Sequence, residues 1–189
     1  MMMIRLRVKD FTPNSILSGR EPGKELLPKL IAAISTQPEQ IIAVDFSSID
    51  VVTASFFREA FRALRDYARH SLECTVVFVN ASNAVIEEAN ILALQMADVF
   101  VFATLSNDLL SAGRVVGHLE DKQALTLKLV TTLGEADARR VKEESGHPTG
   151  QSVWNNRLSA LLSKGILLER IEGRTKIYRP IIKEMAFGY

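Results

Sequence analysis

Hydrophobic positions in the first hundred residues alternate between the spacing typical of strands and the spacing typical of helices. Strand patterns, with a period of two or as a short apolar run, occur at residues 4–8, 41–46, 75–79 and 99–102. Helical patterns, with an apolar stripe every three or four positions, lie between them at residues 21–35, 54–69 and 83–96. This alternation predicts a β-sheet whose strands are joined by helical crossovers.

The apolar run at residues 41–46 indicates a strand in the middle of that sheet. Five of its six residues are apolar, and Asp45 is the exception. A strand exposed on one face would alternate apolar with polar residues, whereas this run needs cover on both faces.

The pattern changes after Thr104. Residues 105–118 contain Ser, Asn, Asp and Gly in groupings typical of turns, and they predict a linker. Helical patterns follow at residues 124–133, at residues 135–145, and from Pro148-Thr149-Gly150 to Gly165. Each of these segments ends at a glycine, which is the residue that most readily ends a helix.

Two strand patterns complete the chain. Residues 166–171 and 175–179 flank Glu172-Gly173-Arg174, which is a hairpin signal. We therefore expect an α/β (α+β) protein with a domain at 1–104, a linker at 105–118, and a second domain of three helices and a β-hairpin at 119–189.

Composition and charge narrow the class of protein. The chain has 189 residues, 47% of them hydrophobic and 24% charged, with a net charge of +1. These values are typical of a soluble globular protein. No apolar run is long enough to span a membrane, and the N-terminus lacks the features of a secretory signal, so we expect a cytoplasmic protein without membrane association.

The positive charge is concentrated near the C-terminus. Residues 149–183 contain seven basic and two acidic side chains, whereas residues 1–104 contain ten basic and twelve acidic ones. A polyanion would therefore bind to the C-terminal domain.

The third helix of this domain has one apolar and one polar face. Its apolar stripe includes Trp154, which we expect to be a core residue. The outward face carries hydrogen-bonding side chains that suit base edges in a DNA major groove, namely Gln151, Ser152, Asn155, Asn156 and Ser159. We expect Thr149 to cap the helix, and three basic residues of the hairpin to contact phosphates: Arg170, Arg174 and Lys176.

These segments resemble the winged helix-turn-helix family of prokaryotic regulators. The resemblance rests on Ala138 to Gly146 as second helix and turn, Gln151 to Leu158 as recognition helix, and Leu161 to Leu167 as the entry into the wing. It implies binding of duplex DNA by a homodimer, because palindromic operators match two-fold symmetric proteins.

The N-terminal domain shows no pattern of catalytic residues. Its one histidine and the two others of the chain, His70, His118 and His147, do not have metal-ligand spacing, and no phosphate-binding glycine loop is present. We therefore expect no enzymatic activity, no cofactor and no metal.

Two polar clusters of this domain are candidate sites. Ser18 and Arg20 precede a helix, where Ser18 has the spacing of a helix cap and Arg20 could hold an anion or a carboxylate. Thr53 and Ser55 lie at the start of the next helix, where either hydroxyl could cap the helix or accept a phosphate.

The same segments resemble the STAS-like domain family, a relative of the STAS domains of anti-sigma-factor antagonists. The resemblance covers residues 4–104 and rests on Val8 to Thr12, Ser18-Gly19-Arg20, Leu26 to Leu30, Val44 to Ile49, and Ser55 to Phe61. It implies a mixed β-sheet covered by helices, with a regulatory role through a ligand or partner. Ala54 stands where the antagonists carry a phosphorylatable serine, so a phosphorylation switch would need Thr53 or Ser55.

Two functions remain open at this point. The first is a transcriptional regulator whose STAS-like domain recognises a signal or partner and whose winged helix binds duplex DNA. The alternative is a partner-switching adaptor that docks a kinase-like ATPase and does not bind DNA.

Overall fold

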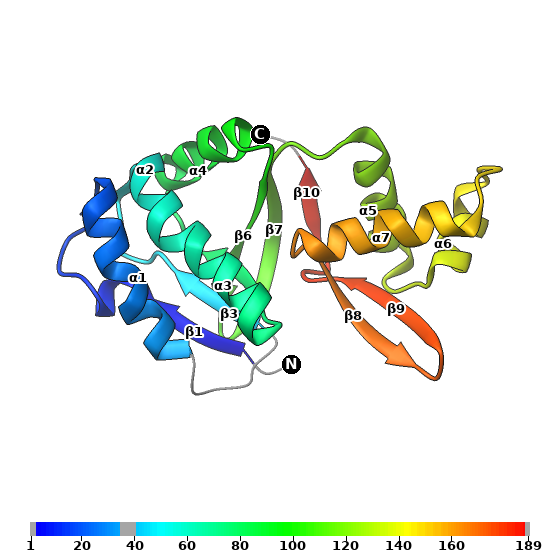
Figure 1. Ribbon diagram of the computed structural model, residues 1–189, viewed down its shortest axis with the longest axis horizontal. Helices are drawn as coiled ribbons and strands as arrows, with labels where there is room; N and C mark the ends of the chain where they lie inside the picture. Colours follow the sequence, from blue (N-terminus) through cyan, green and yellow to red (C-terminus); the bar gives the residue numbers. More distant parts are fainter. Residues whose placement is uncertain (1–2, 35–40, 188–189) are drawn as a thin grey trace.

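The protein is built around a six-stranded β-sheet (Figure 1). The computed structural model describes residues 3–34 and 41–187. In spatial order, the strands are β1 (Met3–Arg7), β3 (Ile41–Asp45), β5 (Thr75–Val79), β6 (Val99–Ser106), β7 (Leu109–Gly117) and β10 (Met185–Phe187). All neighbours are parallel except β6 and β7. The four strands predicted for the N-terminal part and the mixed α/β class are confirmed.

Helices cover one face of the sheet. They are α1 (Arg20–Ile34), α2 (Ala54–Phe57), which continues through a π-helical turn at Arg58–Arg62 into α3 (Ala63–Leu72), and α4 (Asn83–Gln95). The three predicted helices are thus confirmed, although the predicted end of the first, residue 35, lies outside the described residues. Two short strands, β2 (Ile16–Leu17) and β4 (Val51–Val52), pair beside this layer.

Aromatic rings fill the core between these helices and the sheet. Phe57 of α2 lies 5.0 Å from Phe78 of β5 and 5.1 Å from Phe100 of β6, measured between ring centroids. Phe61 lies 4.8 Å from Phe46 at the end of β3. Edge-to-face packing at such distances adds to the hydrophobic stabilisation of these rings.

The C-terminal part folds as three helices and a hairpin, in the predicted order. These elements are α5 (Asp121–Leu133), α6 (Ala138–Ser145), α7 (Gln151–Ser163), β8 (Leu167–Glu172) and β9 (Thr175–Pro180). The second helix begins later than predicted because Ala136 pairs with Tyr178 of β9 through two backbone hydrogen bonds of 2.9 Å. This pairing attaches the hairpin to the connection between α5 and α6.

The C-terminal elements cover the second face of the sheet. Figure 1 shows α5 to α7 on the side of β6 and β7 opposite to α1 to α4. Residues of the sheet and of the C-terminal elements belong to one buried cluster, among them Ile41, Ala43, Val77, Val79, Val99, Val101, Leu127, Trp154, Leu158, Ile166 and Ile181. The prediction that residues 41–46 need cover on both faces is confirmed, since all five residues of β3 are buried.

The predicted linker is wrong for residues 109–117, which form strand β7. Asn107 and Asp108 connect β6 to β7 and both have positive φ, at 48° and 57°. Two such residues form the tight turn of a β-hairpin, for which Asn and Asp are favoured. The polar turn residues that suggested a linker therefore mark a reversal inside the sheet.

Strand β10 was not predicted from the sequence. It pairs in parallel with β7, so the end of the chain returns to the sheet after the hairpin. Gly113 of β7 allows this approach, because a Cβ atom at its position would lie 2.9 Å from the Glu184 carbonyl oxygen and 3.0 Å from Ile182 Cδ1.

We predict that Gly113→Ala lowers the free energy of unfolding by about 1 to 3 kcal/mol, the usual cost of overpacking. Urea denaturation of the full chain measures the change. Gly150→Ala is the control, since the nearest atom to an added Cβ there is 3.7 Å away and the loss of a glycine N-cap costs about 1 kcal/mol or less. Equal losses in the two variants would contradict close packing of β10 on β7.

Candidate nucleic-acid interface

The polar face that we predicted for α7 is exposed in the structure. The side chains of Gln151, Ser152, Asn155, Asn156 and Ser159 are all exposed. Trp154, Leu158 and Leu161 on the opposite face are fully buried, so the assignment of Trp154 to the core is confirmed. This face of α7 therefore presents hydrogen-bonding groups without a carboxylate.

A groove of about 450 Å³ runs between α7, the start of α6 and the hairpin strand β9. It is lined by Asp137, Ala138, Gln151, Asn155, Ser159, Arg174, Thr175, Lys176 and Tyr178. The structure thus brings together five residues that the sequence singled out: three of α7 and two of the hairpin.

Tyr178 and Asp137 contribute to the groove although the sequence analysis did not select them. Burial raises the pKa of Tyr178, and a hydrogen bond with Ser159 partly offsets this. The Asp137 carboxylate accepts a hydrogen bond of 2.7 Å from the Arg140 amide and so caps α6. Asp137 precedes a helical pattern, which is a recognisable sequence signal for an N-cap.

Two of the three predicted phosphate contacts have acidic partners in the protein. Arg170 pairs with Glu135 at 3.0 Å and with Glu172 at 3.2 Å, and Lys176 pairs with Glu169 at 3.1 Å. The hydrogen bonds and charges of these glutamates raise the pKa of Arg170 and of Lys176. Both basic side chains remain exposed and would have to exchange a glutamate for a phosphate.

Arg174 is different because it lies at the tip of the hairpin. Gly173 has a φ of 62° and shapes the turn that presents the exposed Arg174 side chain. Arg174 makes no ion pair with any residue in 3–34 or 41–187. Its charge is therefore available to an external anion without the loss of an internal contact.

Thr149 does not cap α7, contrary to the prediction. Gly150 is the N-cap residue, and no side chain caps the helix there. The Thr149 hydroxyl is buried and has no hydrogen-bond partner among the described residues. Helix α7 begins one residue later than capping by Thr149 would require, so Thr149 precedes the N-cap position.

The Ser18 cluster also differs from the prediction. Helix α1 begins at Arg20, and Gly19 has a φ of 90°, so Ser18 cannot be the N-cap residue. The Glu21 carboxylate, which a capping box needs, instead pairs with Lys24 at 2.9 Å. Arg20 was expected to hold either an anion or a carboxylate. It pairs with the Glu59 carboxylate of the adjacent π-helical turn at 3.2 Å.

Thr53 and Ser55 flank the start of α2, but neither caps it. Thr53 is the N-cap residue without a side-chain hydrogen bond to the helix, and its Oγ1 lies 3.3 Å from Ser55 Oγ. The Ala54 amide donates instead to Glu88 of α4 over 2.8 Å. Glu88, which the sequence analysis missed, thus places a carboxylate at the first amide of α2, where the helix favours negative charge.

A buried carboxylate at the end of β3 connects this strand to β1 and to the residue after β5. Asp45 is fully buried at the end of β3 and pairs with Arg5 of β1 at 2.6 Å. It also accepts hydrogen bonds from Ser47 Oγ at 2.7 Å and from Asn80, after β5, at 3.1 Å. Burial alone would raise the pKa of Asp45, but these bonds outweigh burial and lower it.

Two arginines, one in the π-helical turn at Arg58–Arg62 and one in α3, have structural roles. Arg65 is buried, binds Asp98 at 2.6 Å and donates a hydrogen bond of 2.8 Å to the Val99 carbonyl. Arg62 also binds Asp98, at 3.2 Å. Burial would raise the pKa of Asp98, but the hydrogen bonds and charge of Arg65 outweigh that effect and lower it. This network fixes α3 to the start of β6.

The N-terminal part of the chain is similar to a known protein family. A family model described as a STAS-like domain of unknown function (DUF4325) matches residues 23–85. These residues extend from α1 to the start of α4 and include β3 and β5. No curated protein matches the chain. Residues 23–85 are therefore similar to a STAS-like domain.

Two classes of feature are absent from the described ranges. Within residues 3–34 and 41–187, no three His, Cys, Asp or Glu side chains are grouped so that they could hold a metal ion. No helix in these ranges has the length and apolar character required to cross a bilayer.

We predict that Asp98→Asn lowers the free energy of unfolding at pH 7 by about 2 kcal/mol, because it removes the charged hydrogen-bond partner of the buried Arg65 and leaves one neutral acceptor oxygen. The pKa of Asp98 is lower in the folded protein than the unfolded value of about 3.9. The stabilisation of the fold by the Asp98 carboxylate is therefore present above that pH and is lost as pH falls through the folded pKa.

The variant should therefore lose less stability than the wild type between about pH 5 and pH 2. Denaturant titrations over this range measure the difference. Glu21→Gln, at an exposed surface pair, is the control and should leave the acid dependence unchanged. Parallel acid profiles for wild type and Asp98→Asn would contradict the assignment.

Proposed function

We propose that the protein is a transcriptional regulator that binds duplex DNA through α7 and the β8–β9 hairpin. The observation that carries the proposal is the exposed polar face of α7, which lies beside a hairpin. The tip of this hairpin carries the exposed Arg174, which makes no ion pair with the described residues. A helix of this kind fits a DNA major groove, where Asn and Gln side chains can bind base edges. The role is regulatory and not catalytic.

The arrangement of the C-terminal elements supports this function. Helices α6 and α7 pack on each other in the order of a helix-turn-helix, and the hairpin follows as a wing. The Ala136–Tyr178 pairing holds this wing against the connection that begins α6. In this proposal, Gln151, Ser152, Asn155 and Asn156 read bases, and Arg174 binds a phosphate.

The internal ion pairs determine how much each basic residue would add to the affinity for DNA. Arg174 contributes a full phosphate contact, whereas Arg170 and Lys176 must first leave their glutamates, so each adds less to the affinity. The protein would bind its operator as a homodimer, because two copies on a palindrome double the number of contacts.

A partner-switching adaptor that docks a kinase-like ATPase is the alternative. Such a switch would use a phosphate at Thr53 or Ser55, and the Glu88 carboxylate beside Ala54 would repel it. The regulator is therefore the better supported of the two functions.

We predict that binding to a random-sequence DNA duplex weakens steeply as salt increases. Arg174→Ala should reduce the slope of log affinity against log salt by about one. Lys176→Ala should reduce it by less, because the lysine already has Glu169 as a partner. Fluorescence anisotropy of a labelled duplex over a salt series measures these slopes.

Lys24→Ala is the matched control, since it removes one exposed charge from α1, in the other part of the molecule. It should leave the slope unchanged. Absence of binding by the folded protein at low salt would overturn the proposal. A stoichiometric protein partner recovered from nuclease-treated lysate would then favour the adaptor.

A further inference from the structure

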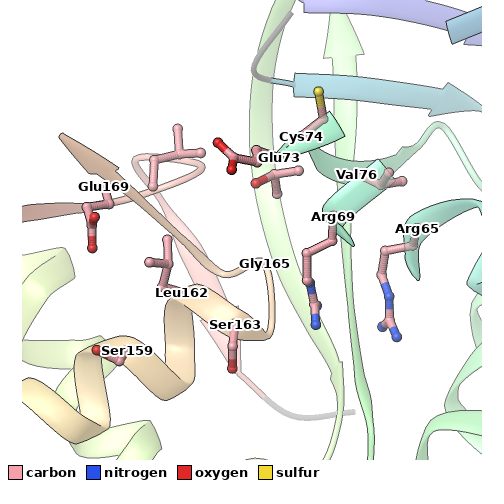
Figure 2. Close-up of a pocket in the computed structure, with 12 residues that line it drawn as sticks. Arg65, Arg69, Glu73, Cys74, Val76, Ser159, Leu162, Ser163, Gly165 and Glu169 are labelled. Atoms are coloured by element: carbon pink, nitrogen blue, oxygen red, sulfur yellow. The ribbon is translucent and has the colours of Figure 1, made fainter. Parts of the chain in front are cut away.

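A cavity of about 450 Å³ lies between the STAS-like part and the C-terminal elements (Figure 2). One wall comes from the end of α3 and the start of β5, and includes Arg69 and Val76. The other wall comes from the end of α7 and the start of β8, and includes Leu162, Ser163 and Leu168. A volume of this size suits a small organic molecule.

Arg69 provides a positive charge at this cavity that forms no ion pair in the described part of the chain. Among the described residues it makes neither an ion pair nor a side-chain hydrogen bond, in contrast to its neighbour Arg65. Burial and the charge of Arg65 lower the pKa of Arg69, and the charges of Asp66 and Asp98 offset this only in part. An anion would compensate a guanidinium in this setting.

The Arg69 guanidinium lies close to the opposite wall of the cavity. A Cβ atom at Gly165 would lie 3.9 Å from Arg69 Nη2 and 3.5 Å from Thr75 Cγ2. The arginine thus reaches the turn that follows α7, and Figure 2 shows it beside that turn. A group bound to Arg69 would therefore contact both parts of the protein.

The remaining walls restrict the ligand further. Val76, Leu162 and Leu168 offer apolar surface to a hydrophobic body. Two acidic residues also line the cavity, but Glu169 is neutralised by Lys176. The Glu73 side chain points away from Arg69 in Figure 2, so the anionic group of a ligand would lie at the arginine end.

We propose that this cavity is a binding site for a small organic anion, with its carboxylate or phosphate on Arg69 and its apolar body against Leu162 and Leu168. Ligand binding at this site does not require the protein to bind DNA. Ser159 of α7 lines both this cavity and the groove beside the hairpin. If the proposed function holds, a ligand here would contact the same helix that reads the bases.

The test uses phenyl phosphate and benzoate as anionic probes and benzyl alcohol as the uncharged probe, with the full chain and no DNA. Titrations followed by ¹H–¹⁵N NMR should give dissociation constants on the order of 1 mM for at least one anion. The largest shifts should occur at Ser163, Gly165 and the Arg69 side chain. The preferred anion identifies whether the natural group is a carboxylate or a phosphate.

Arg69→Gln should weaken anion binding by about ten- to a hundredfold, and Arg69→Lys should retain most of it. Ser163→Phe, a change at an exposed helix position, should block the cavity while Arg69 stays in place. Arg58→Gln is the matched control on the same helical segment and should bind like the wild type.

Three results would overturn the proposal. They are absence of anion binding to the folded protein, equal binding of benzyl alcohol, and unchanged binding by Arg69→Gln. Each is independent of the DNA titration, because that titration contains no probe. Loss of DNA binding with intact probe binding would therefore reject only the regulator, and the reverse result would reject only this site.

Discussion

The burial of the central sheet on both faces is the constraint on which the rest of the structure depends. In β3, Ile42 and Val44 pack in the core with α1 to α4, whereas Ile41 and Ala43 belong to the core shared with α5 to α7. Without the C-terminal elements, the second face of β3, β5 and β6 would be a large exposed apolar patch, which soluble monomers rarely present. The two parts therefore fold against each other, and strands β7 and β10 extend the sheet that both share.

This shared core determines where functional surfaces can lie. Helix α7 has its apolar face in the core, while its polar face and the hairpin tip at Arg174 remain exposed. Its last turn forms one wall of the cavity at Arg69. A single helix thus carries the proposed DNA-reading face and one side of the proposed ligand site. In these proposals, a ligand would directly contact the helix that reads DNA, without a change transmitted through a long path.

Several charged residues have their partners inside the protein. Asp45 joins three strands, Arg65 and Asp98 attach α3 to β6, and Glu88 satisfies the first amide of α2. Pairings of this kind cannot be read from one sequence, because their partners lie 33 to 40 positions apart along the chain. The same holds for Arg170 with Glu135, which reduces the charge available for a polyanion. The family match over residues 23–85 is to a domain of unknown function, so the proposal of a ligand rests on the geometry of the cavity alone.

The sequence by itself determined the local elements, because they follow from the periodicity of apolar positions and from turn residues. The strands and helices of the N-terminal part, the three helices and hairpin, and the exposed face of α7 were all predictable in this way. Only the tertiary structure decided that residues 109–117 complete a hairpin and that β10 returns to the sheet. It also decided which cap residues and basic side chains have partners, and it created the cavity at Arg69. These features depend on contacts between distant segments, which leave no periodic signal in the chain.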